Sequence, residues 1–198
     1  MWSRTTDDRD WRAADFVALD FETTEVDPRR AAPLSVGWIV VRDGRVRMAT
    51  AGYHVIDHAG HVPVASMRVH GLLPDDVAAG LPVAVVAARL RAVLTDRVVV
   101  VAHGAWIEQA LLLRMDVERR PLVDTLAAVR RIDEREGHVR GSVTLSAVAR
   151  RFGVPPLRAH HAFGDALTTA LLLITIAGRL ERERGRCLVD DLVRLGRL

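Results

Sequence analysis

The alternation of apolar and polar segments along the chain predicts a β-sheet that begins with three strands. Three early segments, Phe16–Phe21, Leu34–Val41 and Arg45–Val55, have the branched and aromatic content of strands. Asp43-Gly44, between the second and the third, is typical of a tight two-residue hairpin turn. At least two of these strands are therefore expected to be antiparallel.

The rest of the chain alternates between helical and strand-like segments. In order, these are helices over Pro63–Val69, Pro74–Val77 and Pro82–Leu94, a strand over Arg97–Ala102, a helix over Ala105–Met115, a strand over Pro121–Asp124, and helices starting at Asp124-Thr125 and covering Thr144–Phe152, Ala162–Arg184 and Leu188–Leu195. The four valines Val98–Val101 predict a strand that is covered on both faces. This order indicates an α/β fold, a mixed β-sheet flanked by α-helices.

Composition allows one sizeable folded domain and excludes a disordered chain. The chain has 198 residues, of which 49% are hydrophobic. It contains no lysine, so all 28 basic residues are arginines, and the net charge is +3. Arginine binds phosphates in a bidentate manner, although biased codon usage is the favoured explanation of its abundance. A nucleic acid is therefore compatible with the charge but is not required by it.

Segment lengths and charges predict a cytoplasmic protein without a membrane partner. The N-terminus is charged from Arg4 to Arg12 and has no apolar signal region. The longest apolar stretch, Ala166–Ala177, is too short to span a bilayer. Cys187 is the sole cysteine, which excludes an intrachain disulfide. We expect an N-terminal extension over residues 1–13 and a single domain over residues 14–198.

Asp20 and Glu22 form the first of three acidic clusters. Side chains two residues apart on a strand share a face, so these carboxylates are expected to lie roughly 6–7 Å apart along the chain. Two acids in an apolar segment are costly unless a cation neutralises them, and hard divalent cations prefer carboxylate oxygens. A solvated acidic turn is the simpler alternative for this pair alone.

The other two clusters are Glu108, just after the valine strand, and His160 with Asp165. A loop histidine five residues before a helix carboxylate can converge with it on one point. Near pH 7, a neutral histidine suits the general base that activates water. Alone, Glu108 also fits an acid favoured by the helix dipole. Taken in order, four carboxylates and one histidine indicate a two-metal phosphodiesterase site.

The clusters resemble the three motifs of the DEDDh exonuclease family, which includes the DnaQ-like proofreading subunits of bacterial replicative polymerases, such as the epsilon subunit of DNA polymerase III. The matching segments are Asp20-Phe21-Glu22-Thr23-Thr24, Ala102-His103 through Glu108, His160 through Asp165, and also Val69-His70-Gly71 and Val123-Asp124-Thr125. The resemblance covers roughly residues 14–178. It implies a ribonuclease H-like fold and metal-dependent 3′–5′ exonuclease activity.

The resemblance also implies roles for individual residues. Asp20, Glu22, Glu108 and Asp165 are expected to bind two divalent ions, Mg²⁺ or Mn²⁺, with His160 rather than His161 as the base. Thr23 and His70 are expected near the terminal nucleotide, and Asp124 is expected to cap a helix.

The expected partners are the 3′ ends of single-stranded nucleic acid, with DNA favoured over RNA, and a DNA polymerase subunit or a second copy of the chain. The apolar stripe Leu188, Leu192, Leu195 and Leu198 on the last helix either packs on its own domain or meets such a protein partner.

Three departures from the family pattern keep a second interpretation open. Glu25 stands in place of glycine, Gly104 in place of asparagine, and Glu108 in place of aspartate. Glutamate is one methylene longer, and a misplacement of about 1 Å can cost on the order of 100-fold in rate. The alternative is a catalytically weakened or inactive module that binds nucleic acid or a polymerase. Trp106 and Phe163, inside the motifs, fit either the core or base stacking.

Overall fold

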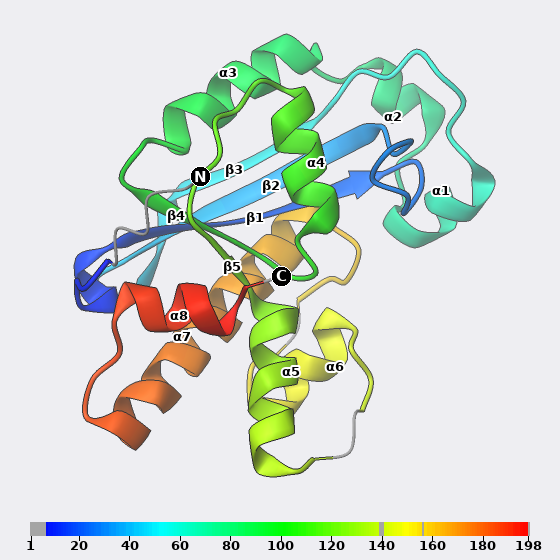
Figure 1. The fold of residues 1–198 in the computed structure, drawn as a ribbon. Helices are drawn as coiled ribbons and strands as arrows, with labels where there is room; N and C mark the ends of the chain where they lie inside the picture. The colour runs from blue at the N-terminus through cyan, green and yellow to red at the C-terminus, as the bar shows by residue number, and fades with distance from the viewer. Residues whose placement is uncertain (1–6, 139–140, 156, 198) are drawn as a thin grey trace.

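The fold is taken from a computed structural model that describes residues 7–138, 141–155 and 157–197 (Figure 1). Residues 1–6 of the expected N-terminal extension lie outside the described residues. Trp11–Ala13 form a short 3-10 helix, and Trp11 is buried with its backbone N–H donating to the carbonyl of Cys187 at 3.1 Å.

A five-stranded mixed sheet forms the centre of the domain. Its strands are β1 (Asp15–Thr23), β2 (Pro33–Arg42), β3 (Arg45–Val55), β4 (Val98–Ala102) and β5 (Leu122–Asp124). They lie in the order β3-β2-β1-β4-β5, in which β1, β2 and β3 are antiparallel neighbours while β4 and β5 run parallel to β1. The predicted mixed sheet and its opening antiparallel strands are confirmed.

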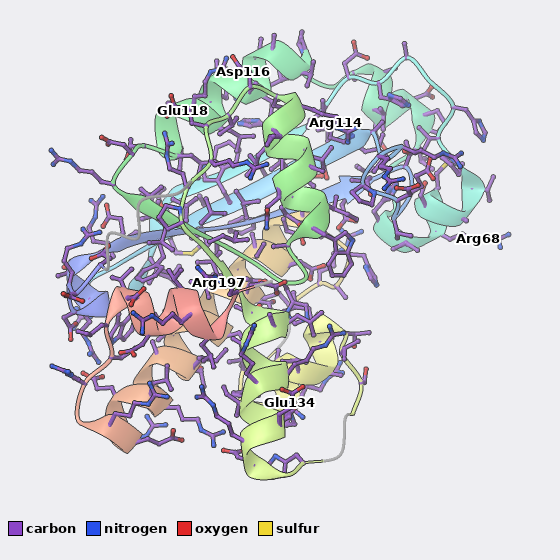
Figure 2. All side chains as sticks on the ribbon, in the orientation of Figure 1. Arg68, Arg114, Asp116, Glu118, Glu134 and Arg197 are labelled. Carbon is purple, nitrogen blue, oxygen red and sulfur yellow. The ribbon has the colours of Figure 1, made fainter. Side chains whose placement is uncertain are left out.

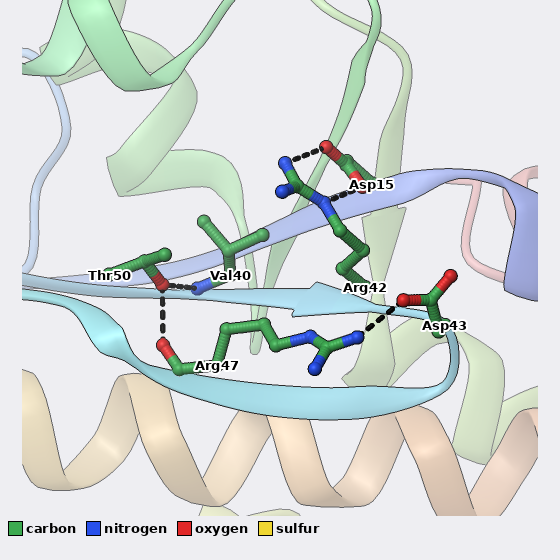
Figure 3. Close-up of polar contacts among 6 residues, drawn as sticks. All are labelled: Asp15, Val40, Arg42, Asp43, Arg47 and Thr50. Carbon is green, nitrogen blue, oxygen red and sulfur yellow. Dashed lines mark hydrogen bonds and ion pairs between the residues drawn. The ribbon is translucent and has the colours of Figure 1, made fainter.

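The β2–β3 hairpin contains the predicted two-residue turn. Asp43 and Gly44 both have positive φ, as the favoured hairpin turn requires. Further along, the register shifts between Trp38 and Val40. The Thr50 hydroxyl fills this irregularity because it accepts from the Val40 N–H at 3.1 Å and donates to the Arg47 carbonyl at 2.7 Å (Figure 3).

Ion pairs connect this hairpin to its neighbours on the surface. Arg42 reaches across to Asp15 on β1 through two hydrogen bonds, of which the Nε–Oδ1 bond is 2.8 Å long, and Arg47 pairs with Asp43 at the turn (Figure 3). Exposed pairs of this kind stabilise a fold by less than about 1 kcal/mol each. The fold therefore depends mainly on its apolar core.

Helices cover both faces of the sheet (Figure 1). The helices α3 (Val83–Val93) and α4 (Trp106–Arg114) pack on one face. The other face carries α5 (Thr125–Glu136), α6 (Leu145–Arg151), α7 (Ala162–Arg184) and α8 (Val189–Leu195). Two short helices, α1 (Val64–His70) and α2 (Pro74–Ala78), lie at one end of the sheet.

The long helix α7 is a core helix. By length and composition alone it could cross a membrane. Its buried face, which includes Leu172, Leu173 and Ile176, instead packs across β1 and β2. Leu192 and Leu195 of α8 are buried in the same core, so this helix packs on its own domain. Leu198 lies outside the described residues.

Candidate active site

The predicted site residues meet in one cleft of about 680 Å³ near the end of β1. Its walls include Asp20, Glu22, Thr23, His70, Glu108, His160 and Asp165. Strand β1 supplies the first three, α1 supplies the histidine at its end, α4 supplies the glutamate, and α7 with its preceding loop supplies the rest. Segments far apart in the sequence are thus brought together at the position expected from the motifs.

Three carboxylates form the tightest group in the cleft. Ligand oxygens of Asp20, Glu22 and Asp165 all lie within 4.8 Å of one another. Alternation on β1 places the first two on one face, and the first turn of α7 brings Asp165 to them. A group of this spacing can hold a divalent cation through oxygen ligands.

The electrostatics of the cluster are strained without a cation. Burial raises the pKa of Asp20 well above its usual value, and the charges of Glu108, Glu22 and Asp165 raise it further. Burial, followed by the charge of Asp165, raises the pKa of Glu22 to about 7. Burial also raises the pKa of Asp165, although the hydrogen bond from the His160 N–H opposes that shift. A positive charge among these acids would favour their ionised forms and lower these pKa values.

Glu108 belongs to the same electrostatic unit although it is outside the close group of three. Burial raises its pKa to about 8, against the lowering effect of the backbone N–H groups of Glu108 and Phe21. One carboxylate oxygen of Glu108 and one of Glu22 are buried without a hydrogen-bond partner in the described structure. Unpartnered buried oxygens beside clustered carboxylates fit the hard divalent cation that the motifs imply.

The tandem histidines have different positions. His160 is an exposed loop residue with φ 56, and its backbone N–H donates to Asp165 Oδ2 at 2.9 Å. His161 caps α7, where Nδ1 accepts from the Gly164 N–H at 3.4 Å, and its ring stacks on Tyr53 with centroids 4.5 Å apart. His160 lines the cleft, whereas His161 lines a neighbouring hollow of about 440 Å³.

His70 offers a hydrogen-bond donor at the wall of the cleft. Its Nδ1 accepts from the Leu72 N–H at 3.0 Å, so the proton of the neutral ring is on Nε2, which is buried without a partner in the described structure. Burial, followed by the charge of His160, lowers the pKa of His70 and favours that neutral form. The Thr23 hydroxyl donates to the Glu25 carbonyl at 2.8 Å.

Asp124 does more than cap a helix. Its carboxylate accepts from the first turn of α5, at Leu126 and Ala127, as expected. It also accepts from the N–H groups of Gly104 at 2.9 Å and Ala105 at 3.1 Å, which holds the turn that leads into α4 and Glu108. This second role is not among the predictions from the sequence. An aspartate that ends an apolar strand was the available indication, but its second partner is twenty residues away.

The apolar rim of the cleft was also missed. Val26 and Val69 line the cleft with side chains that are 81% and 51% exposed. Isolated valines in a loop and on a short helix have no pattern that identifies them as a rim before the fold is known. The cleft therefore has apolar side chains at its rim, Val26 and Val69, in addition to the carboxylates that line it.

The comparisons with known proteins agree with this geometry. The RNase T model of the exonuclease family matches residues 17–173. The PolC-type DNA polymerase III of Thermotoga maritima is 26% identical over 187 residues, which are 89% of this chain but 13% of that protein. The chain therefore spans a small part of that relative.

Solved structures show the same fold. A structure of exonuclease I has a TM-score of 0.74 at 16% identity, covering 85% of this chain and 42% of that one. Escherichia coli exonuclease I in complex with a dT13 oligonucleotide has a TM-score of 0.70 at 16% identity, covering 86% and 42%. These likenesses confirm the predicted ribonuclease H-like fold. Because the family model covers most of the chain, from β1 into α7, the chain belongs to the exonuclease family and is a DnaQ-like exonuclease domain.

Proposed function

We propose that this domain is a metal-dependent 3′–5′ exonuclease that removes terminal nucleotides from single-stranded nucleic acid, with DNA preferred over RNA. The observation that carries the proposal is the convergence in one cleft of four carboxylates with raised pKa, of which Glu22 and Glu108 are buried. Family membership supports nuclease chemistry, and the cleft supplies the residues for it.

The carboxylates fit two divalent ions, Mg²⁺ or Mn²⁺. Asp20, Glu22 and Asp165 would hold them, and Glu108 would add charge from beside Asp20. When bound, such ions supply positive charge that stabilises the phosphoryl oxygens and lowers the pKa of water.

The histidines of the cleft supply proton transfer and positioning. His160 would take the proton of the attacking water, since its side chain is exposed and its backbone N–H donates to the Asp165 carboxylate. The water oxygen bonds to phosphorus, the bond from phosphorus to the 3′ oxygen breaks, and the shortened strand leaves with that oxygen. His70 Nε2–H would donate to the terminal nucleotide, and Thr23 would contact the same nucleotide.

Substrate and partners follow as further parts of the proposal. Relatives include a PolC-type polymerase and an exonuclease I bound to a single-stranded oligonucleotide. We infer that residues 14–198 act as one exonuclease domain in the cytoplasm, on free 3′ ends, together with a polymerase subunit or a second copy of the chain.

Digestion of end-labelled oligonucleotides tests this function. Single-stranded DNA, duplex DNA and short RNA are compared with Mg²⁺, with Mn²⁺ and with EDTA. We expect a ladder that shortens from the 3′ end of 5′-labelled single-stranded DNA, only with metal. Intact oligonucleotides under all conditions, or shortening from the 5′ end, would contradict the proposal.

The alternative, a weakened or inactive binding module, draws on the place of Glu108 outside the close group of three carboxylates. A metal titration separates the two functions. Weak binding of a single ion together with intact oligonucleotides supports the binding module, whereas two ions and a ladder support the enzyme.

A further inference from the structure

Trp106 presents an aromatic ring to solvent at the cleft. Its side chain is 47% exposed, and within residues 7–138, 141–155 and 157–197 every other tryptophan, phenylalanine and tyrosine is buried or half-buried. The indole N–H makes no hydrogen bond in that part of the chain. Aromatic rings bury a large apolar area when they pack, so an exposed one at a binding cleft is a candidate contact for a ligand.

The ring lies close to the backbone of Gly104. A Cβ on that glycine would lie 2.7 Å from Trp106 Cζ3 and 2.9 Å from Cη2, closer than atoms can approach. The backbone N–H of Trp106 donates to the Gly104 carbonyl at 2.8 Å, and the backbone N–H of Gly104 in turn donates to the Asp124 carboxylate. The backbone of Trp106 is therefore connected to strand β5 through Gly104 and Asp124.

Space, not backbone conformation, explains glycine at position 104. Its φ is 76, which asparagine tolerates better than most residues. An asparagine there would keep the turn, but its Cβ would force the indole ring to shift. Glycine in place of the family's asparagine at position 104 and tryptophan at position 106 are thus one linked feature of this chain.

The surroundings of Trp106 suit a nucleobase next to a phosphate. The ring lines the same cleft as Glu108 and the carboxylate floor, and Val26 and Val69 form the apolar rim of that cleft. Every base has an aromatic face, so stacking on such a ring is tolerant of sequence. A base in a duplex is already stacked on both sides, whereas a base in a single strand offers a free face.

We propose that Trp106 is the stacking platform for an unpaired base of a strand that enters the cleft, and that Gly104 supplies the space for its ring. This inference rests on the proposed function and deepens it, because it assigns the residue through which the cleft selects unpaired bases. Trp106 is a substrate-binding residue in this role and takes no part in the chemistry.

Binding of a 5′-fluorescent oligothymidylate, followed by anisotropy in Ca²⁺, tests the inference, with the length of the oligonucleotide verified afterwards on a gel. Loss of base–aromatic stacking in Trp106→Ala should weaken binding by about 5- to 150-fold, and Trp106→Phe should retain most of the affinity. Gly104→Asn should weaken binding like Trp106→Ala, and the double variant should lose no more. An oligonucleotide with abasic residues near its 3′ end should bind the parent and Trp106→Ala equally.

The result separates this inference from the proposed function. If the parent fails to bind the oligonucleotide, or Trp106→Ala binds as tightly as the parent, stacking is excluded even when digestion proceeds. If binding depends on Trp106 but no oligonucleotide is digested with Mg²⁺ or Mn²⁺, the inference stands and the exonuclease function fails. Melting temperatures equal to that of the parent show that the variants fold.

Discussion

Gly37 and Phe163 are in backbone contact: a Cβ on the glycine would lie 2.2 Å from the amide nitrogen of the phenylalanine. Gly37 is also the residue of β2 that pairs with Asp20 on β1. The start of α7 can therefore approach the sheet beside Asp20, and Asp165, two residues after Phe163, reaches the carboxylate group. One glycine on a strand without any site residue thus helps to assemble the cleft.

Gly37→Ala is expected to destabilise the fold and weaken metal binding together. The methyl group forces α7 away from β2, and overpacking of this kind costs about 1–3 kcal/mol or more. Urea unfolding and calorimetric titration with Mn²⁺ measure the two effects. Gly141→Ala is the matched control, because among the described residues beyond its chain neighbours no atom lies within 4 Å of the added methyl group. Equal stability of the two variants would contradict the close approach of α7.

Local elements were predictable because their causes are local. The apolar runs of β1 and β4 and the Asp43-Gly44 turn each depend on neighbouring residues, and α7 has the predicted bounds Ala162–Arg184. The three motifs likewise identified the carboxylates that meet in the cleft.

Contacts between distant segments were not predictable in the same way. The approach of Gly37 to Phe163, the stacking of Tyr53 on His161 and the exposure of Trp106 depend on how α7 and α4 sit on the sheet. No spacing within a single segment contains that information. Glycines on strands and aromatic residues within motifs are therefore better interpreted once the layers are known.

His160→Ala is expected to reduce kcat without destabilising the protein. A general base typically contributes about 10²- to 10⁴-fold, and the exposed ring of His160 has no packing to lose. His161→Ala is the comparison. It is expected to lower stability more than kcat, because it removes the cap of α7 and the stacking on Tyr53. Single-turnover digestion and thermal melting measure both variants. A larger loss of kcat in His161→Ala than in His160→Ala would reverse the assignment of the base.

The raised pKa values of Glu22 and Glu108 should make the metal-free protein lose stability as the pH rises from about 6.5 to about 8. In the unfolded chain, Glu22 and Glu108 ionise near their usual pKa of 4.5, whereas the folded chain retains their protons until about pH 7 and about pH 8. The folded state therefore binds more protons within this window, so its stability is highest below it and decreases through it. Asp15, whose pKa Arg42 lowers, has the opposite effect but below this window. His54, His70 and His103 also have the opposite effect, because burial lowers each pKa from its usual 6.5, and their contribution is complete above about pH 6.5.

Thermal melting in EDTA across this pH range measures the effect. A loss of about 1 kcal/mol lowers Tm by about 2–4 °C in a domain of this size. Mg²⁺ or Mn²⁺ should raise Tm more at pH 8 than at pH 5, because only the ionised carboxylates bind the cation strongly. A Tm that rises with pH in EDTA would show that the buried acids are not protonated in the folded state.

Glu108→Gln is expected to raise the stability of the metal-free protein and to slow digestion. The amide has the same shape but no charge, so it removes the largest of the neighbouring charges that raise the pKa of Asp20. At pH 8 in EDTA, Tm should therefore rise, while the digestion rate with Mn²⁺ should fall by roughly 10- to 100-fold as the site loses one negative charge for cations. Glu118→Gln, in the exposed loop after α4 (Figure 2), should change neither quantity.

Glu108→Asp tests whether the longer side chain suits this cleft. Glu108 already reaches the carboxylate cluster from a buried position, so shortening it by one methylene withdraws the carboxylate from Asp20 and leaves a small void. We expect slower digestion than in the parent, since a shift of about 1 Å can reduce a rate by up to about 100-fold. If Glu108→Asp instead digests faster, glutamate at this position limits the parent, and the weakened-module interpretation gains its first functional support.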